Sequence, residues 1–303
     1  IELLNPFNYL KIFIQIKKLV KKNSSCVYYL HTPLASHLFR IFNYFNKIKI
    51  IYFVHGFRFT LQSNEWKNFF FKNIEKILSY KTNIFITINK HDFNYAKSNL
   101  IKKASCYKIN GVGLNVPSSY FVNKIRNKKE IKKILVIAAY KKAKGYLEIL
   151  KVAEMLQNQN IMIECYGYGN YFKYNSIKIK KNLNNIFFNN FDINLKNKIK
   201  NFDILLHLSK REGLPVAIMQ SLMEGLPVIC YDIRGNNDLI KNKVNGYFVR
   251  SYKDVPNKIH YLNLEVGLFN KMRHNAFKSI NKNFSKKKIN LSLFNIIKNF
   301  SKH

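Results

Sequence analysis

The sequence predicts an α/β protein with two domains, each built around a doubly wound parallel sheet. Two observations predict this fold class. Short apolar runs of strand length alternate with longer helical patterns along the chain, and such alternation is typical of parallel sheets. The alternation is interrupted once, by the polar and charged stretch 123–133, and then begins again. We therefore interpret this stretch as the linker between the two domains.

In the first half of the chain we predict four strands, at 27–30, 50–54, 83–88 and 105–109, and four helices, at 7–22, 34–45, 66–80 and 91–98. His31 and His55 stand directly after the first two strands, and Gly111 follows the fourth closely. Ligands of doubly wound sheets bind beyond the carboxyl ends of the strands. These three residues are therefore candidates for a binding site.

In the second half we predict six strands, at 133–139, 161–166, 186–188, 203–208, 227–231 and 246–249. We predict helices from 145 to about 157, from 215 to about 224, one that starts shortly before 240 and, in two or three segments, between 254 and 300. Lys144 follows the first of these strands, where an ammonium group can neutralise a diphosphate, although lysine is common throughout the chain. Gly167 opens a Gly-Tyr-Gly turn after the second strand. The turn is weak evidence for a dinucleotide site, and we interpret it as lining a nucleotide pocket.

The stretch 203–240 holds the strongest indication of chemistry. Glu212 precedes the predicted helix, where a carboxylate can accept hydrogen bonds from sugar hydroxyls. Free N–H groups of Gly213 and Leu214 at the start of that helix would attract a phosphate or a sugar oxygen, and Pro215 suits its first turn. Gln220 lies roughly 7.5 Å further along the helix axis, a separation that suits an extended nucleotide-sugar. On these residues alone, an ordinary strand–helix–strand unit with a solvated glutamate competes strongly.

Composition limits the alternatives. The chain carries 52 Lys and Arg against 16 Asp and Glu, a formal net charge of +36, which attracts nucleic acid, anionic membranes or phosphorylated substrates. The basic residues are spread along the whole chain, unlike a nucleic-acid-binding arm, so we expect no nucleic-acid partner. The four cysteines form no Cys-x-x-Cys pair, which favours reduced core thiols of a cytosolic protein. His31 and His37 lack a third ligand at metal spacing, so we expect no zinc.

The segment EGLPVAIMQ at 212–220 closely resembles the EGLPxxxxE donor-binding signature of family 4 glycosyltransferases, which are retaining enzymes with the GT-B fold. Further segments resemble the members of that family that build capsular polysaccharides and exopolysaccharides: HTP at 31–33, HGF at 55–57, ITINKHD at 86–92, GVG at 111–113, GLPVI at 225–229 and DIRGNNDLI at 232–240. The sequence departs from the family pattern at Gln220, where a second glutamate is usual, and at Ala139, where an arginine is frequent.

The resemblance implies a GT-B architecture, in which two Rossmann-like domains with parallel sheets face a cleft. We expect an acceptor-side domain at 1–128, a nucleotide-sugar-binding domain at 129–285 and a C-terminal helix at 286–303 that crosses back to the first domain. The family's first domain begins with a strand and a glycine-rich loop that have no counterpart after Ile1. We therefore expect the first domain to be incomplete.

The resemblance also implies roles for individual residues. Glu212 and His55 would be catalytic, and Lys144 would balance the charge of the leaving diphosphate. The remaining donor-site residues would be Gly111, Gly167, Gly213, Leu214, Pro215 and Gln220, of which Gln220 would hold the ribose. His31 and Thr32 would lie on the acceptor side. We expect no metal or other cofactor, because GT-B enzymes hold the diphosphate with helix N-termini and basic side chains.

The predicted activity is the transfer of a hexosyl or N-acetylhexosaminyl group, with retention, from a nucleotide-diphosphate-sugar to a glycan or lipid-linked acceptor in surface polysaccharide synthesis. We expect a UDP-linked donor, a cytoplasmic location and peripheral contact of the basic helices 7–22 and 66–80 with an anionic membrane, although core packing explains much of their apolar character. The alternative is a catalytically impaired remnant or binding protein on the same fold, suggested by Gln220, Ala139 and the incomplete first domain. Restoring Gln220 to glutamate and extending the chain upstream would discriminate between these two hypotheses.

Overall fold

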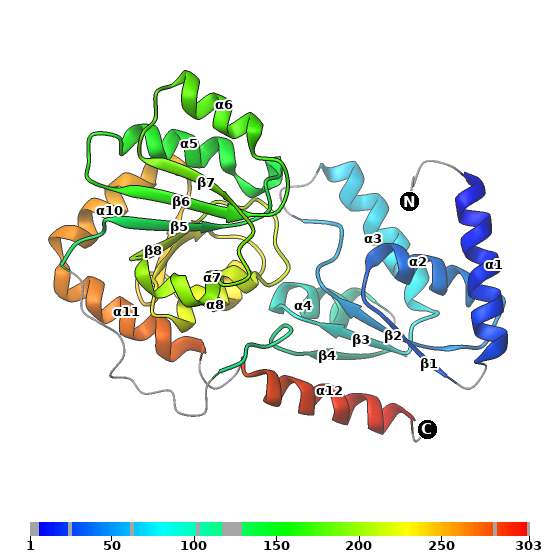
Figure 1. The fold of residues 1–303 in the computed structure, drawn as a ribbon. Coiled ribbons are helices and arrows are strands. Elements are labelled where there is room, and N and C mark those ends of the chain that lie inside the picture. The colour runs from blue at the N-terminus through cyan, green and yellow to red at the C-terminus, as the bar shows by residue number, and fades with distance from the viewer. Residues whose placement is uncertain are drawn as a thin grey trace. The chain divides into compact units, whose positions relative to one another are not determined.

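The structure is a computed structural model of the 303-residue chain. It describes residues 6–23, 26–60, 64–100, 104–116, 129–280 and 284–301. Most of the stretch that we interpret as the linker, residues 123–128, lies outside the described residues. The chain divides into two compact units, of which unit 1 comprises Ile1–Gly111 with Asn290–His303, and unit 2 comprises Val112–Ile289 (Figure 1).

Unit 1 contains a four-stranded parallel sheet with the strand order β1-β2-β3-β4. The strands are β1 (Val27–Leu30), β2 (Lys49–Val54), β3 (Ile84–Thr87) and β4 (Ser105–Lys108). The helices are α1 (Pro6–Lys22), α2 (Pro33–Phe42), α3 (Glu65–Ser79) and α4 (Lys90–Asn99), together with the part of α12 (Lys286–Ser301) from Asn290 onward. The Lys49 ammonium lies 5.6 Å from the ring centroid of Phe300, so α12 ends beside β2.

Local sequence explains where the helices of unit 1 begin. Thr32, Asn64 and Asn89 are the N-cap residues of α2, α3 and α4, and each side chain accepts a hydrogen bond from a backbone N–H of its own helix. Such caps satisfy donors that the first turn of a helix otherwise leaves unpaired. Strands β2 and β3 are buried almost throughout, as expected for parallel strands covered on both faces.

Unit 2 contains a six-stranded parallel sheet with the order β10-β9-β8-β5-β6-β7. The strands are β5 (Lys133–Ile137), β6 (Met162–Gly167), β7 (Ile186–Asn190), β8 (Ile204–His207), β9 (Val228–Tyr231) and β10 (Gly246–Val249). The α-helices are α5 (Tyr146–Met155), α6 (Phe172–Lys180), α7 (Leu195–Lys198), α8 (Val216–Met223), α9 (Asn236–Leu239), α10 (Val255–Leu264) and α11 (Val266–Ile280). Three short 3-10 helices are η2 (Lys142–Lys144), η3 (Ile199–Asn201) and η4 (Tyr252–Asp254).

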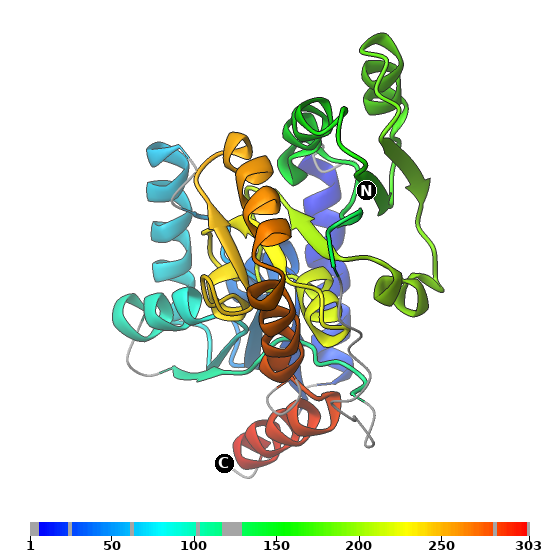
Figure 2. The ribbon, with the colours of Figure 1, turned by 90° about the vertical axis from the view of Figure 1, so that its left-hand side faces the viewer.

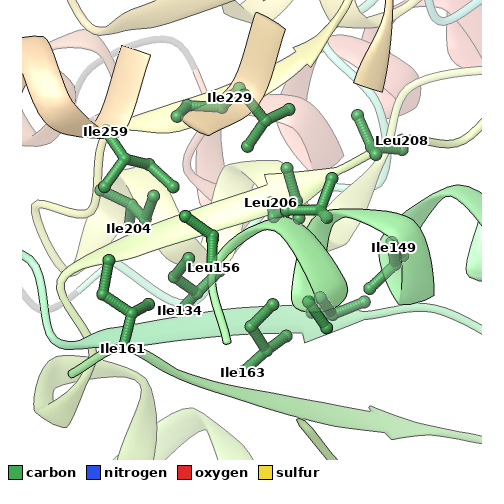
Figure 3. Packing of buried hydrophobic residues seen from close by; sticks show 14 of the residues in the cluster. Ile134, Ile149, Leu156, Ile161, Ile163, Ile204, Leu206, Leu208, Ile229 and Ile259 are labelled. Carbon is green, nitrogen blue, oxygen red and sulfur yellow. The ribbon is translucent and has the colours of Figure 1, made fainter. Parts of the chain in front are cut away.

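The core of unit 2 lies between this sheet and its helices. Helices α5 and α6 lie on one face of the sheet and α8 on the other (Figure 1), and α11 packs against α8 (Figure 2). Figure 3 shows the buried side chains of Ile134, Ile149 and Leu206, from β5, α5 and β8, pointing toward one another. This packing positions β5 and β8, and the loops that follow these two strands contain candidate site residues.

The strand order of unit 2 reverses between β5 and β8. From β5 the chain proceeds outward through β6 and β7, and from β8 it proceeds the other way through β9 and β10. The connections that leave β5 and β8 therefore diverge to opposite faces, and ligands of doubly wound sheets bind beyond the carboxyl ends of the strands at such a point. Lys144 follows β5 and Glu212 follows β8, so both predicted donor-site residues belong to this switch point.

The predicted fold class, an α/β protein with two parallel sheets, is confirmed. Each predicted strand is present with its ends shifted by at most two residues. Two helices were not predicted, α6 and the four-residue α7. Three of the nine residues of α6 are lysines, and Tyr174 is its one buried residue, so its sequence has little helical periodicity. Among the described residues, no helix has both the length and the apolar character needed to cross a bilayer.

Candidate active site

Glu212 lies on the loop between β8 and α8, and two cationic or potentially cationic groups share one of its oxygens. The Lys144 ammonium donates to Glu212 Oε1 at 2.6 Å, and His207 Nε2 lies 3.0 Å from the same oxygen. The Glu212 side chain is 12% exposed and that of His207 is 4% exposed. Among the described residues, no hydrogen-bond partner contacts the other oxygen, Oε2. One side of the carboxylate is thus fixed and the other remains an acceptor.

The charge state of Glu212 follows from these contacts. Burial by itself raises the pKa of a carboxyl group, but here the hydrogen bonds and charges of His207 and Lys144 outweigh burial and lower the pKa of Glu212 to about 2. The carboxyl group is therefore ionised at neutral pH. It can accept hydrogen bonds, but it holds no proton to donate as a general acid.

A close approach between two loops places Lys144 beside Glu212, although the residues are 68 positions apart. Gly145 has φ +79°, and a Cβ atom there would lie 2.1 Å from the Leu208 carbonyl oxygen. Only glycine fits such a contact, and glycine also adopts this left-handed conformation without strain. The Lys210 N–H donates to the Ala143 carbonyl at 2.9 Å, so hydrogen bonding also joins the two loops.

The N-terminus of α8 presents unpaired backbone donors. Pro215 was predicted in the first turn of this helix, but it is the N-cap residue directly before Val216. The N–H groups of Gly213 and Leu214 donate no hydrogen bond to any described residue. Arg234 stabilises the loop, because its Nε donates a hydrogen bond to the Glu212 carbonyl at 3.1 Å. Such free donors at a helix start attract anions.

We call Glu212, Lys144, His207 and Arg234, with the backbone of Gly213 and Leu214, the Glu212 cluster. Two predicted donor-site residues stand apart from this cluster. Gln220 is half-buried on α8, and its side chain makes no hydrogen bond to the described residues. Gly167 ends β6, two strands away from β8 in the sheet order. A Cβ atom at Gly167 would lie 1.9 Å from the Ala138 carbonyl oxygen, so glycine is required where the ends of β5 and β6 approach each other.

In unit 1 the structure brings His31 and His55 together. They follow the adjacent strands β1 and β2, and His31 Nδ1 lies 3.2 Å from His55 Nε2. Burial lowers the pKa of both rings, and the charge of His31 lowers that of His55 further. Both rings are therefore neutral at pH 7, and one donates its N–H to the other. His31 also stacks on Phe53, at 5.1 Å between ring centroids.

The other predicted residues of unit 1 have structural surroundings of their own. The hydroxyl of Thr32 accepts the Ala35 N–H at 3.4 Å as the cap of α2. Gly111 has φ +77°, a left-handed conformation that favours glycine in this turn. After His55, the Phe57 N–H donates to the buried Asp92 carboxylate at 3.4 Å, which ties the His-Gly-Phe loop to the start of α4.

Two residues of the unit 2 cluster were missed by sequence reasoning. His207 is the last residue of β8, but the predicted strand extended to 208, so the rule that selected His31 and His55 as residues following their strands did not select His207. Arg234 follows β9 in the loop that reaches Gly213, because a Cβ atom at Gly235 would lie 2.2 Å from the Gly213 carbonyl oxygen. No local pattern marks that approach. Among the described residues, no three His, Cys, Asp or Glu side chains gather as metal ligands.

Comparison with known families identifies the class of protein that carries this site. The family model described as glycosyl transferases group 1 matches residues 120–279, and the model described as glycosyl transferase 4-like matches residues 2–89. The chain belongs to the glycosyl transferases group 1 family, and its fold is GT-B. The predicted glycosyltransferase class and GT-B fold are thereby confirmed.

Individual relatives are distant in sequence. The chain is 24% identical to EpsD of Bacillus subtilis (strain 168) over 257 residues, which cover 80% of this chain and 68% of EpsD. It is 26% identical over 262 residues to the Escherichia coli UDP-Gal:alpha-D-GlcNAc-diphosphoundecaprenol alpha-1,3-galactosyltransferase, covering 79% of this chain and 66% of that enzyme. The crystal structure of HepE from Anabaena in complex with UDP-glucose has a TM-score of 0.77 and 14% identity, covering 97% of this chain and 84% of HepE.

Proposed function

We propose that the chain transfers a hexosyl or N-acetylhexosaminyl group from a UDP-linked sugar to a glycan or lipid-linked acceptor in surface polysaccharide synthesis. The observation that carries this proposal is the Glu212 cluster at the switch point of unit 2, beside the free N-terminus of α8. The names of two similar proteins support the substrate classes, since one is a UDP-Gal-dependent transferase with a diphosphoundecaprenol-linked acceptor and the other was crystallised with UDP-glucose.

Glu212 would hold the donor sugar. Its ionised carboxylate has one oxygen occupied by Lys144 and His207, which fixes the plane of the group. The remaining oxygen can accept hydrogen bonds from sugar hydroxyls, and hydrogen bonds to a charged acceptor are stronger than neutral ones. A sugar held in this way keeps its anomeric carbon in one position relative to the leaving group.

The leaving diphosphate would be stabilised by groups that are already in place. As the bond between the anomeric carbon and the diphosphate oxygen breaks, negative charge grows on that oxygen. The free N–H groups of Gly213 and Leu214 and the dipole of α8 favour this charge. Lys144 gives one of its three N–H donors to Glu212, so two remain for phosphate oxygens. This arrangement lowers the barrier because the donors need no reorganisation.

The remaining residues would complete the donor and acceptor sites. Gln220 would hold the ribose and Gly167 would line the nucleotide pocket. On unit 1, His55 would contact the donor sugar as a neutral hydrogen-bonding group, while His31 and Thr32 would lie on the acceptor side. We include retention at the anomeric carbon on the strength of the family resemblance, and a cytoplasmic location at the inner face of the membrane on the strength of the basic surface and the unpaired cysteines.

Thermal unfolding with a panel of UDP-, GDP- and ADP-sugars tests the donor assignment. A ligand that binds the native state raises the unfolding temperature, increasingly so as its concentration exceeds the dissociation constant. We expect a shift with one UDP-sugar that is lost in Glu212→Ala. Glu154→Ala is the matched control, since Glu154 forms an ion pair with Lys181 on the surface of the same unit. A folded chain that responds to no donor would contradict the proposal and support the impaired remnant.

A further inference from the structure

Helix α3 of unit 1 carries a row of apolar side chains that face solvent. Trp66, Phe69, Phe70 and Ile77 lie on the helix and Tyr80 is its C-cap residue. Their exposed fractions range from 57% for Ile77 to 80% for Trp66. We call these five residues the α3 face. Contiguous exposed apolar surface is uncommon on a protein that acts alone in water, and it usually marks a contact with a partner or a membrane.

Helical geometry places the five side chains in a single stripe. With 3.6 residues per turn, successive residues are about 100° apart around the helix axis, so the five positions fall within an arc of about 100°. The opposite side of the helix carries the residues that are buried against unit 1, namely Glu75, Leu78 and Ser79. The side chains of the stripe therefore do not pack in the hydrophobic core of unit 1. It is a second apolar face of the same helix.

A neighbouring segment extends the stripe. The Tyr44 hydroxyl, which follows α2, donates to the Ile77 carbonyl at 2.8 Å, so the Tyr44 ring lies beside the end of α3. The Lys81 ammonium lies 4.9 Å from the centroid of this ring. An aromatic ring with an adjacent ammonium at the margin of an apolar surface is the arrangement that suits a membrane–water interface.

Charge is distributed unevenly around the α3 face. Lys67 lies on one side of the stripe, and Lys72 and Lys76 lie on the other, all three exposed. The described part of unit 1 contains three acidic residues, Glu65, Glu75 and Asp92, of which only Glu65 is exposed. The apolar stripe is thus bordered by cations, with a single exposed carboxylate at the start of the helix.

We propose that the α3 face binds the surface of an anionic lipid bilayer. The aromatic and aliphatic side chains would enter the headgroup region, and the lysines would contact anionic headgroups. Charge complementarity favours this partner over a second copy of the chain, because two copies joined through this face would bring their lysines together. It also favours a bilayer over double-stranded nucleic acid, since recognition of the duplex phosphates by lysines gives no role to an exposed stripe of Trp, Phe and Ile.

The single tryptophan of the chain, Trp66, makes this surface directly observable. We would record its fluorescence, and the co-sedimentation of the protein, with vesicles of phosphatidylcholine alone and of phosphatidylcholine mixed with phosphatidylglycerol. We expect a blue shift and co-sedimentation with the anionic vesicles, both weakened by salt. An unshifted spectrum in the presence of anionic vesicles would overturn the proposal, and so would a blue shift without vesicles that accompanies dimer formation.

Two pairs of substitutions distinguish binding through the α3 face from non-specific hydrophobic binding. Phe69→Ser/Ile77→Ser, which keeps Trp66, should lower partitioning into anionic vesicles by at least about tenfold. Ile179→Ser/Ile193→Ser removes two similarly exposed isoleucines from unit 2 and should leave partitioning unchanged. Equal loss in both pairs would contradict the assignment to α3. The thermal shift with a UDP-sugar reports on unit 2 independently, so failure of this proposal is distinguishable from failure of the proposed function.

Discussion

At the scale of single residues, Glu212 depends on two partners that reach it from different loops. Lys144 and His207 both contact Oε1, and together they keep a mostly buried carboxylate ionised. A carboxyl pKa of about 2 in the native state, against about 4.3 for an unperturbed glutamate, corresponds to about 3 kcal/mol of stability at neutral pH. Because the native pKa is the lower one, this contribution is complete above the unfolded pKa and is lost as pH falls toward 2.

His207→Leu is expected to raise the pKa of Glu212 and thereby to weaken donor binding at mildly acidic pH. The reason is that leucine removes the hydrogen bond at 3.0 Å and leaves Lys144 as the one remaining partner of Oε1. His207→Gln is the matched control, since a glutamine amide can donate to the same oxygen. Thermal shift by the donor, measured from neutral pH down to about pH 4, distinguishes them. Identical pH dependence in the leucine variant and the wild type would refute this role.

Sequence reasoning identified most of the residues of this cluster but not their contacts. Glu212, Gly213 and Leu214 are local in sequence, and the helix start that follows them is marked by Pro215. The pairing of Lys144 with Glu212 is not local, because it depends on the approach of Gly145 to the Leu208 carbonyl. The shared hydrogen bond between His31 and His55 likewise depends on the register of β1 and β2.

At the scale of elements, the loop after β5 packs directly against the loop after β8. The left-handed conformation of Gly145 and its contact with Leu208 leave no space for a side chain. Gly145→Ala is therefore expected to destabilise the protein by about 2–4 kcal/mol and to displace Lys144 from Glu212. Both the unfolding temperature and the donor-induced shift should fall.

Gly267→Ala is the control for this glycine substitution. Gly267 lies in α11, and a Cβ atom there meets nothing within 4 Å, so alanine should stabilise the helix by up to about 1 kcal/mol. Urea denaturation of the two variants gives opposite signs if Gly145 is needed for loop contact. A loss of similar size in both would show that the close approach at Leu208 has no special role.

Elements with a continuous apolar sequence were predicted well, and short polar ones were not. The strand at 50–54 has no polar residue within it, so its position follows from hydrophobicity alone. Helix α7 has four residues, and Leu195 is the one that is buried. A single buried residue provides no periodicity, so tertiary contacts determine that helix. Helix α3 was predicted as an element, but the outward direction of its apolar stripe required the structure.

At the scale of the whole molecule, we propose that the net charge of +36 favours two anionic partners. In unit 2, Lys144 and the start of α8 would receive a diphosphate. In unit 1, the lysines that border the α3 face would contact a membrane, where a lipid-linked acceptor resides. Composition alone gave the sign of the charge, and the even spread of the basic residues argued only against nucleic acid. From the arrangement of buried and exposed groups we propose one anionic partner for each unit.

Sugar transfer from a UDP-sugar at the Glu212 cluster can be followed as UDP release in the presence of a lipid-linked acceptor. Lys144→Ala and Glu212→Gln should each lower the rate by about 10²- to 10³-fold, because each removes preorganised charge from the site. Lys142→Ala, an exposed lysine of the same 3-10 helix, should retain the wild-type rate. UDP release by Glu212→Gln as fast as by the wild type would contradict the account.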